Sequence, residues 1–137
     1  MIRLELVARD ADVEAGDSIR VSVAWNGVAT EARAIRVSAQ ADIVLDGEHH
    51  EVAGSRVTAE VPVSSSAGNG EVHLVLPLGS PASYVGRRFS IVWSVNAVLD
   101  IARGRDQRYA GPTFRIGAAG SRIRAALDRA APPNDGR

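Results

Sequence analysis

The amino-acid sequence predicts an all-β protein, built as an antiparallel sandwich or barrel of about eight short strands. In most segments apolar residues fall on every second position, which is the period of a strand with one buried face. Turn residues separate these segments at intervals of roughly ten residues. Val, Ala, Ile and Leu dominate the hydrophobic 45% of the 137 residues, and only 4% are aromatic. A single domain fits this length, because two independent cores would each be marginal.

The first two predicted strands are joined by an acidic connection. The first strand holds Ile2, Leu4 and Leu6, and the second runs over residues 19–25. Residues 10–17 lie between them and end in Ala-Gly-Asp, a turn signal. Asn26-Gly27 follows the second strand and is a strong hairpin signal. Apolar alternation resumes only at Ala34 or Ile35, so a longer loop is an equal alternative.

The middle of the chain alternates between apolar strands and polar turns. Residues 35–45 predict either one bent strand or two short ones, and residues 46–50 (Asp-Gly-Glu-His-His) predict a polar turn. Residues 57–63 predict the next strand, residues 64–70 a flexible loop rich in Ser and Gly, and residues 72–78 a further strand.

The longest strand pattern lies late in the chain. It alternates without a break through Phe89, Ile91, Trp93, Val95, Ala97, Leu99 and Ile101. A charged turn over residues 103–108 and a last strand over residues 113–116 follow.

The pattern changes after Gly117, and we divide the chain there. Residues 1–117 predict the β domain, and residues 118–137 predict a short basic amphipathic helix and a disordered tail. Ile123, Ala126, Leu127 and Ala130 share one face of that helix, which ends before Pro132-Pro133. A membrane-surface or partner helix is one alternative, and a frayed or docked tail is the interpretation that we favour.

Composition narrows the class of protein. Cysteine and lysine are absent, which excludes disulfides, thiolate metal sites and lysine chemistry. The sequence begins without a signal-peptide pattern and has no apolar run near the roughly 20 residues that span a bilayer. We therefore expect a cytoplasmic protein and no membrane partner. Nor is there a basic strip with exposed aromatic residues for nucleic acid.

Charge is divided unevenly along the chain. Up to Glu71 there are six Arg and twelve acids, and from Val72 on there are ten Arg and four acids, so the halves carry minus six and plus six. This asymmetry can mark a binding face or self-complementary assembly. We favour the simpler interpretation, in which strands of the two halves interleave and mix the charges.

Four acids in the first connection form the metal candidate: Asp10, Asp12, Glu14 and Asp17. Acidic loops at the end of a sandwich gather oxygen ligands for Ca²⁺ in C2-type membrane-binding domains. Here the glycine comes one place late, and Val21 stands where a bidentate Glu would close a calcium loop. A solvated turn is the favoured interpretation. The same holds for His49-His50, since adjacent strand residues point to opposite faces.

No catalytic constellation and no cofactor motif is present in the sequence. Ser64 to Ser66 lack a nucleophile elbow, and there is no phosphate-binding glycine-lysine loop. Trp25 and Trp93 lie on apolar alternating faces, which predicts core packing. We therefore predict a protein that is not an enzyme.

The predicted binding residues are Tyr84, Arg87 and Arg88, in a connection punctuated by Pro and Gly. A tyrosine at a strand entry of a sandwich often packs its ring on the core and bonds backbone through its hydroxyl, and this is the role that we favour for Tyr84. A contact with a partner is the alternative, because loops on rigid sandwiches carry function.

Several of these segments together resemble the arrestin-like domain. They are Leu76-Pro77, Pro81-x-Ser83-Tyr84-x-Gly86, Ile91-x-Trp93-x-Val95-x-Ala97-x-Leu99-Asp100, Phe114-x-Ile116 and the Ala15-Gly16-Asp17 turn. The resemblance covers roughly residues 2–116 and implies an immunoglobulin-like sandwich. Such domains occur twice in arrestins, in the arrestin-like subunit of retromer and in bacterial sporulation-control proteins.

The resemblance implies a scaffold or adaptor rather than an enzyme. The chain holds one sandwich and not two, so the interdomain phosphate sensor of arrestins does not carry over. We expect a protein partner bound through sandwich loops or an edge strand, and a homodimer is a further hypothesis. A C2-like, calcium-dependent membrane binder that uses residues 10–17 is the alternative.

Overall fold

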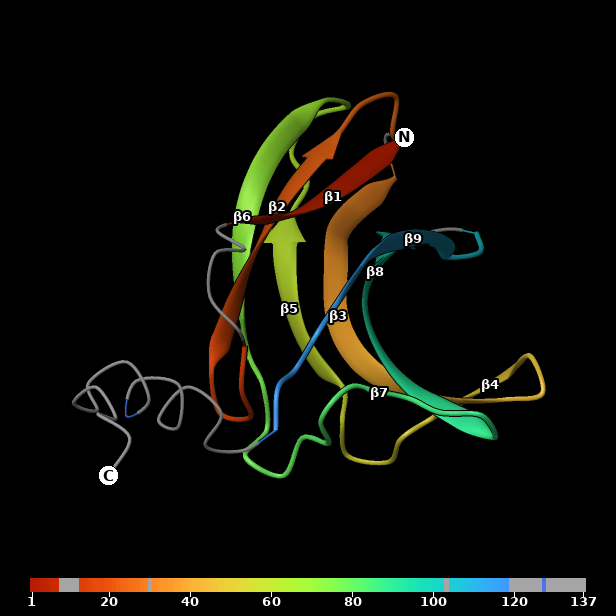
Figure 1. Cartoon of the computed structure of the whole chain (residues 1–137). Coiled ribbons are helices and arrows are strands. Elements are labelled where there is room, and N and C mark those ends of the chain that lie inside the picture. Colours follow the sequence, from red (N-terminus) through yellow and green to blue (C-terminus); the bar gives the residue numbers. More distant parts are fainter. Residues whose placement is uncertain (8–12, 30, 103, 119–126, 128–137) are drawn as a thin grey trace, which may run out of the picture.

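The described part of the chain forms nine strands in two antiparallel sheets that pack face to face in the computed structural model (Figure 1). This confirms the predicted all-β sandwich. The structure describes residues 1–7, 13–29, 31–102, 104–118 and 127. Its strands are β1 (Ile2–Val7), β2 (Ser18–Trp25), β3 (Ala32–Leu45), β4 (Glu48–Glu51), β5 (Val57–Pro62), β6 (Gly68–Val75), β7 (Tyr84–Val85), β8 (Phe89–Ile101) and β9 (Gln107–Phe114).

The two sheets differ in size. The smaller has the order β1-β2-β6. In the larger sheet β3 and β8 pair along nearly their whole length, and each has two shorter strands on its other edge. β5 pairs with the first part of β3 and β4 with its end, while β7 pairs with the start of β8 and β9 with its later part. Strands of the two halves of the sequence therefore interleave, as predicted.

The core lies between the facing surfaces of the sheets. Alternate residues of each central strand point inward, and the largest side chains that are almost fully buried are Trp93, Ile35, Leu74, Leu76, Leu99, Ile116, Val21, Val23, Val37 and Val95. Burying such side chains contributes roughly 1.5–3 kcal/mol each relative to exposure. The indole N–H of Trp25 donates to the Ser65 carbonyl at 3.2 Å. Core packing of Trp25 and Trp93 is thus confirmed.

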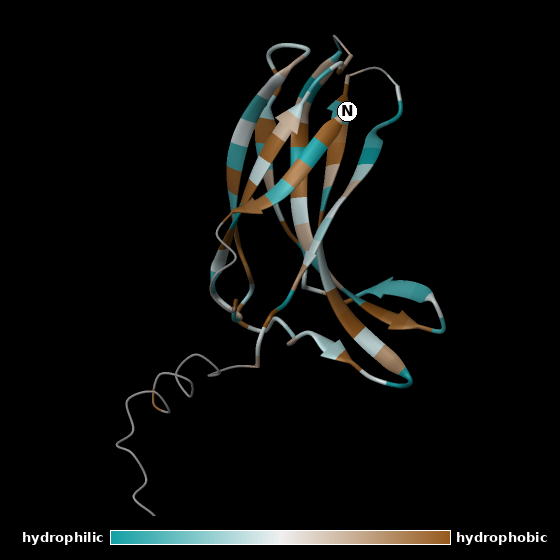
Figure 2. Cartoon of the chain, turned by 45° about the horizontal axis from the view of Figure 1, so that its top comes forward, coloured by the Kyte–Doolittle hydropathy of each residue, from teal (hydrophilic) through white to brown (hydrophobic). Residues whose placement is uncertain are grey.

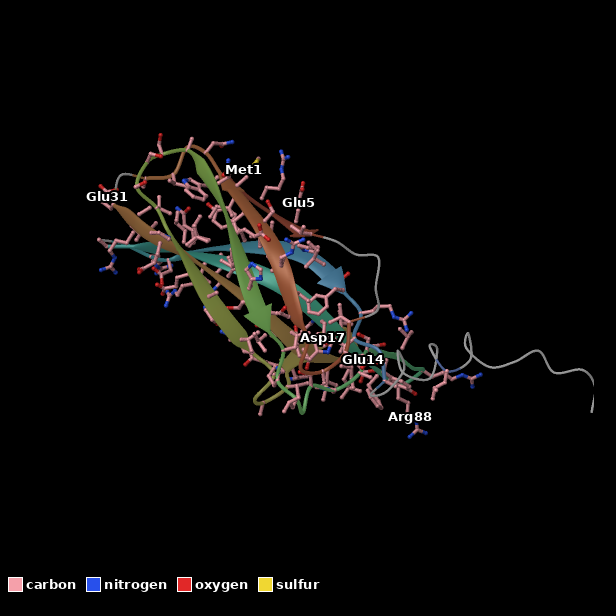
Figure 3. The ribbon with its side chains drawn as sticks, turned by 90° about the vertical axis from the view of Figure 1, so that its left-hand side faces the viewer. Met1, Glu5, Glu14, Asp17, Glu31 and Arg88 are labelled. Carbon is pink, nitrogen blue, oxygen red and sulfur yellow. The ribbon has the colours of Figure 1, made fainter. Side chains whose placement is uncertain are left out.

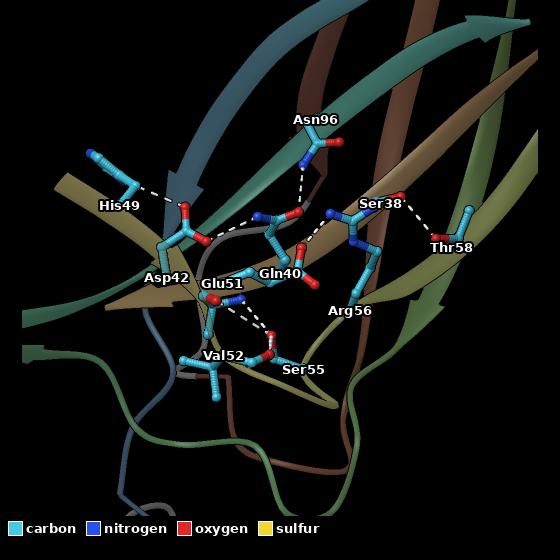
Figure 4. Close-up of polar contacts among 11 residues, drawn as sticks. Ser38, Gln40, Asp42, His49, Glu51, Val52, Ser55, Arg56, Thr58 and Asn96 are labelled. Carbon is cyan, nitrogen blue, oxygen red and sulfur yellow. Dashed lines mark hydrogen bonds and ion pairs between the residues drawn. The ribbon is translucent and has the colours of Figure 1, made fainter. Parts of the chain in front are cut away.

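A buried serine marks the point where β3 changes partners. Neither β4 nor β5 pairs with Ala41. The Ala41 N–H donates instead to the Ser55 hydroxyl at 3.1 Å, and the Ala41 carbonyl accepts from the Val52 N–H at 2.8 Å (Figure 4). Ser55 also donates to the Val52 carbonyl at 2.7 Å. The β4–β5 turn therefore completes the ladder of β3 between its two partners.

The outer face of the larger sheet is polar and connected across strands. Gln40 accepts from Asn96 at 3.4 Å and donates to Asp42 at 2.9 Å, and His49 lies 3.4 Å from Asp42 (Figure 4). Ser38 bonds Thr58 at 2.8 Å on the neighbouring strand. The opposite faces of β3 and β8 are apolar, so the sheet has one clear inner side.

Two ion pairs join the oppositely charged halves of the sequence. Arg33 lies 3.0 Å from Asp100, and Arg36 lies 3.0 Å from Asp106. Both Arg residues lie on β3, beside β8. The pairs are partly exposed, so each contributes little to stability. Each pair joins an Arg of the acidic half to an Asp of the basic half, so these contacts hold the two halves together without offsetting the excess charge of either.

Several strand limits differ from the sequence prediction. The residues 46–50 are not all turn, because β4 begins at Glu48. β6 begins at Gly68, inside the predicted loop, and β9 begins at Gln107, inside the predicted turn. The strand predicted to residue 78 ends at Val75, and Leu78 is 88% exposed. These strands lie at edges or on solvent-facing surface, where polar residues and glycine carry no alternation signal.

The structure decides two alternatives that the sequence left open. Residues 35–45 belong to one strand, the long β3. Asn26-Gly27 opens a longer loop, since β3 begins at Ala32. The predicted helix that holds Ile123, Ala126, Leu127 and Ala130 lies outside the described residues apart from Leu127. Among the described residues, no helix has the length and apolarity needed to cross a bilayer.

Candidate functional site

The larger sheet is longer than the smaller one, and its far end extends past the sandwich. β3 and β8 curve away from the smaller sheet there and carry β4 and β7 with them (Figure 1). Ala41 and Trp93 face each other and are fully buried. Two residues further along, Ile43 is 37% exposed, and beyond it Leu45 and Phe89 are 44% and 42% exposed. The inner face of the sheet therefore continues beyond its cover.

The strand register places five side chains on this uncovered surface. Ile43 pairs with Ile91, which pairs with Tyr84, and Leu45 pairs with Phe89. Directly paired residues share a face, as do residues two apart on one strand. We call the surface formed by Ile43, Leu45, Tyr84, Phe89 and Ile91 the tip face. Val85, which is 90% exposed, points to the opposite side of the same sheet.

Tyr84 and Phe89 form the aromatic part of the tip face. Their ring centroids are 5.1 Å apart with an interplanar angle of 37°, a favourable tilted arrangement. Tyr84 is 49% exposed. The expectation that its ring packs on the core is therefore wrong, because the smaller sheet does not reach this far. One side of the ring packs on Phe89 and the rest is open to solvent.

The absence of a side chain at Gly86 allows the Tyr84 ring to pack against the hairpin backbone. A Cβ at Gly86 would lie 2.4 Å from Cε1 of Tyr84 and 2.7 Å from its hydroxyl oxygen. The Gly86 N–H donates to the Phe89 carbonyl at 3.0 Å, which closes the β7–β8 hairpin. Arg87 and Arg88 form its two-residue tip and are exposed.

The approach to β7 is fixed by hydrogen bonds from the core. The indole N–H of Trp93 donates to the Pro81 carbonyl at 2.9 Å. Two residues later the Ser83 N–H donates to the Ile116 carbonyl at 2.9 Å, and the Ile116 N–H donates to the Ser83 hydroxyl at 2.9 Å. Tyr84 thus follows a segment that is bonded to two buried residues, Trp93 and Ile116, so the fold itself fixes its position.

The other side of the tip face is the β3–β4 hairpin. Leu45 pairs with Glu48, and Asp46 and Gly47 between them have φ of 51° and 80°. Positive φ at both central residues is the requirement of a type I′ hairpin turn, which Asp-Gly satisfies. β4 is hydrophilic beside the hydrophobic end of β3 (Figure 2). The apolar surface is therefore bordered by acids on this side.

The acidic connection of the calcium hypothesis is described only in its second half. The Glu14 N–H donates to the Asp17 carboxylate at 2.9 Å, and the Asp17 N–H donates to the Glu14 carbonyl at 3.0 Å. These bonds give Asp17 a local role in closing the turn. Asp10 and Asp12 lie outside the described residues. Glu14 and Asp17 lie at the same end of the molecule as Arg88, opposite Met1 and Glu31 (Figure 3).

The described residues contain no group of three or more His, Cys, Asp or Glu side chains that could hold a metal ion. His49 and His50 are strand residues of β4 rather than turn residues, and they point to opposite sides. His49 lies 3.4 Å from Asp42, and His50 lies 3.4 Å from Glu48. The two imidazoles therefore do not converge.

The serines considered as nucleophiles border a shallow pocket at the other end of the sandwich. Ser64, Ser65 and Ser66 line it together with Val28 and Val63. The Ser65 hydroxyl donates to the Ala67 carbonyl at 2.6 Å, so it forms a hydrogen bond within its own loop. The residues that line the pocket include no acid, base or histidine.

Solved structures contain a similar fold. Spo0M, the sporulation control protein of Bacillus subtilis, matches 94% of this chain with a TM-score of 0.53 and 20% sequence identity. The chain has the arrestin-like sandwich fold. It corresponds to 55% of the Spo0M chain, so it spans about half of that protein. No protein-family model and no curated protein matches the sequence.

The binding residues predicted from the sequence lie on or beside the tip face. Tyr84, Arg87 and Arg88 were predicted as binding residues, and the structure brings them together on one hairpin. The exposure of Ile43, Leu45 and Phe89 was not predicted, because alternation places each of them on the apolar face of its strand. The signal available was length: β3 and β8 have 14 and 13 residues, against 8 in β2 and β6 and 6 in β1.

Proposed function

We propose that this arrestin-like domain is a non-enzymatic adaptor that docks a protein partner on the tip face. The observation that supports the proposal is the exposure of three large apolar side chains of two paired strands, Ile43, Leu45 and Phe89, beside Tyr84. Exposed apolar surface with a polar border is typical of protein interaction sites. Tyr and Arg, which are enriched at such sites, both lie here.

The tip face fits this role better than the strand edges do. β4 is an edge strand of four exposed polar residues, Glu-His-His-Glu, and charged side chains hinder pairing with another chain. β7 has only two residues to offer. A docking face held by the Trp93–Pro81 bond is preorganised, which lowers the entropic cost of binding.

An affinity capture from lysate of the native host tests the proposal. Tagged wild-type protein, Phe89→Glu and Val85→Glu are compared by mass spectrometry against the tag alone. Val85 is the matched control, since it lies on the same hairpin and is more exposed than Phe89 but points to the other side. We expect a stoichiometric protein with the wild type and Val85→Glu that is lost with Phe89→Glu. Equal capture by all three would overturn the assignment to this face.

A further inference from the structure

The tip face has oppositely charged flanks, and we propose that its occupant is a second copy of this chain, in a two-fold symmetric dimer. The inference rests on the proposed function, that the tip face docks a protein, and names which protein it docks. Its support is self-complementarity, which a symmetric interface requires because each copy must offer both halves of every contact.

The charges beside the tip face are divided by sign across the sheet. The strand order is β4-β3-β8-β7. Exposed Asp46 and Glu48 lie on the β4 side, where Glu48 is 3.4 Å from His50, and exposed Arg87 and Arg88 lie at the β7–β8 hairpin. Neither arginine takes part in an ion pair within the described part of the chain. The apolar side chains of the tip face therefore separate an acidic flank from a basic one.

Symmetry decides how two such faces meet. Two identical faces in contact are related by a two-fold axis in the plane between them. With the axis parallel to the strands, the β4 flank of one copy lies opposite the β7–β8 hairpin of the other. The acidic flank of each copy then faces the arginines of the other copy, and the apolar side chains of the two tip faces are in contact. With the axis across the strands, like charges would face each other, which costs free energy. The charge pattern therefore selects the first arrangement.

The size of the face predicts the strength of the dimer. Its five partly exposed side chains offer on the order of a few hundred Å² of apolar surface. Stable complexes bury about 800 Å² on each partner. The arrangement therefore predicts a reversible dimer whose population depends on protein concentration, weakened but not abolished by salt because only the flanks are screened.

Sedimentation velocity over a wide range of protein concentration tests this directly. We expect the wild type to pass from monomer to dimer, Val85→Glu to behave the same way, and Phe89→Glu to dissociate at least about tenfold more readily. Near-ultraviolet circular dichroism of Phe89→Glu checks the fold of the variant, and we expect a native spectrum.

A charge exchange supplies a second test that does not depend on the apolar centre. The double variant Arg87→Glu/Arg88→Glu makes both flanks acidic, and the double variant Asp46→Asn/Glu48→Arg makes the β4 flank basic like the hairpin, with Asn keeping the positive φ of the turn. Each variant alone is expected to dimerise at least about tenfold more weakly than the wild type. An equimolar mixture of the two is expected to recover dimer, because acid then meets arginine on both flanks.

The outcomes separate the two proposals. A wild type that stays monomeric at every concentration overturns the second-copy inference, as does a dimer that Phe89→Glu leaves intact or a mixture that does not recover. If the monomeric wild type still captures a host protein that Phe89→Glu loses, the proposed function stands with a different occupant. If it captures nothing, the proposed function falls as well.

Discussion

The indole of Trp93 links the centre of the core to the tip face through the Pro81 carbonyl, 2.9 Å away. Trp93 is fully buried and packs against Phe114 with ring centroids 5.8 Å apart. Pro81 lies three residues before Tyr84, on the segment that leads into β7. One buried side chain therefore stabilises the fold and also fixes the position of the exposed aromatic pair.

Trp93→Phe tests this link. The change leaves a partly buried carbonyl without its donor and removes ring volume, so we expect unfolding to become easier by about 2–4 kcal/mol. Urea titration measures the loss. Hydrogen exchange then reports the local effect: the Gly86 amide, bonded to Phe89, is expected to exchange faster even where global unfolding is negligible. Unchanged exchange at Gly86 would show that the segment is held by other contacts.

Ser55→Ala is expected to destabilise the protein by about 1–2 kcal/mol, because it removes the acceptor of the buried Ala41 N–H. Ser80→Ala is the matched control. The Ser80 hydroxyl is buried and has no hydrogen-bond partner within the part of the chain that the structure describes, so its removal should be neutral or slightly stabilising. Thermal and urea unfolding of the two variants measure the difference. Equal losses would mean that the Ser55 bond adds nothing beyond side-chain volume.

Gly86→Ala probes the aromatic pair without introducing charge. The new methyl group would meet the Tyr84 ring, which is a side chain that can move, so we expect little loss of stability. The ring must leave its place beside Phe89, and a crystal structure or ring-current shifts of the Phe89 protons report this. Self-association by sedimentation should weaken in parallel. A variant with a displaced ring and unaltered association would remove Tyr84 from the docking surface.

Asp17→Ala addresses the calcium alternative. Asp17 accepts the Glu14 N–H, so we expect a loss of about 1 kcal/mol from the turn itself. That loss should be the same with and without millimolar Ca²⁺, and the wild-type melting temperature should not respond to the ion. A bound ion raises the melting temperature by mass action. A calcium-dependent rise that Asp17→Ala abolishes would favour the C2-like function over the adaptor.

Strands with one buried face and one exposed face could be predicted from the sequence. Alternation over Ile19–Trp25 and Phe89–Ile101 required a half-buried sheet, and the structure has β2 and β8 there. β4 escaped prediction because Glu-His-His-Glu has no apolar period, and its strand geometry comes from pairing with the end of β3.

The tip face was predictable only in part, for a related reason. Alternation shows that Leu45 and Phe89 share a face, but not whether another sheet covers that face. Cover depends on where β2 and β6 end in space, which is a property of the whole fold. Tyr84 was predicted to pack on the core because tyrosines at strand entries of sandwiches often do so. That prediction is wrong because the smaller sheet does not extend over Tyr84.

Site-specific photocrosslinking in the native host tests the docking account most directly. A benzophenone amino acid replaces Phe89 in one strain and Val85 in another, and crosslinked products are identified by mass spectrometry. We expect a discrete protein adduct from position 89 and none from position 85; an adduct of twice the chain mass would identify a second copy. Adducts from position 85 alone, or the same adducts from both positions, would contradict it.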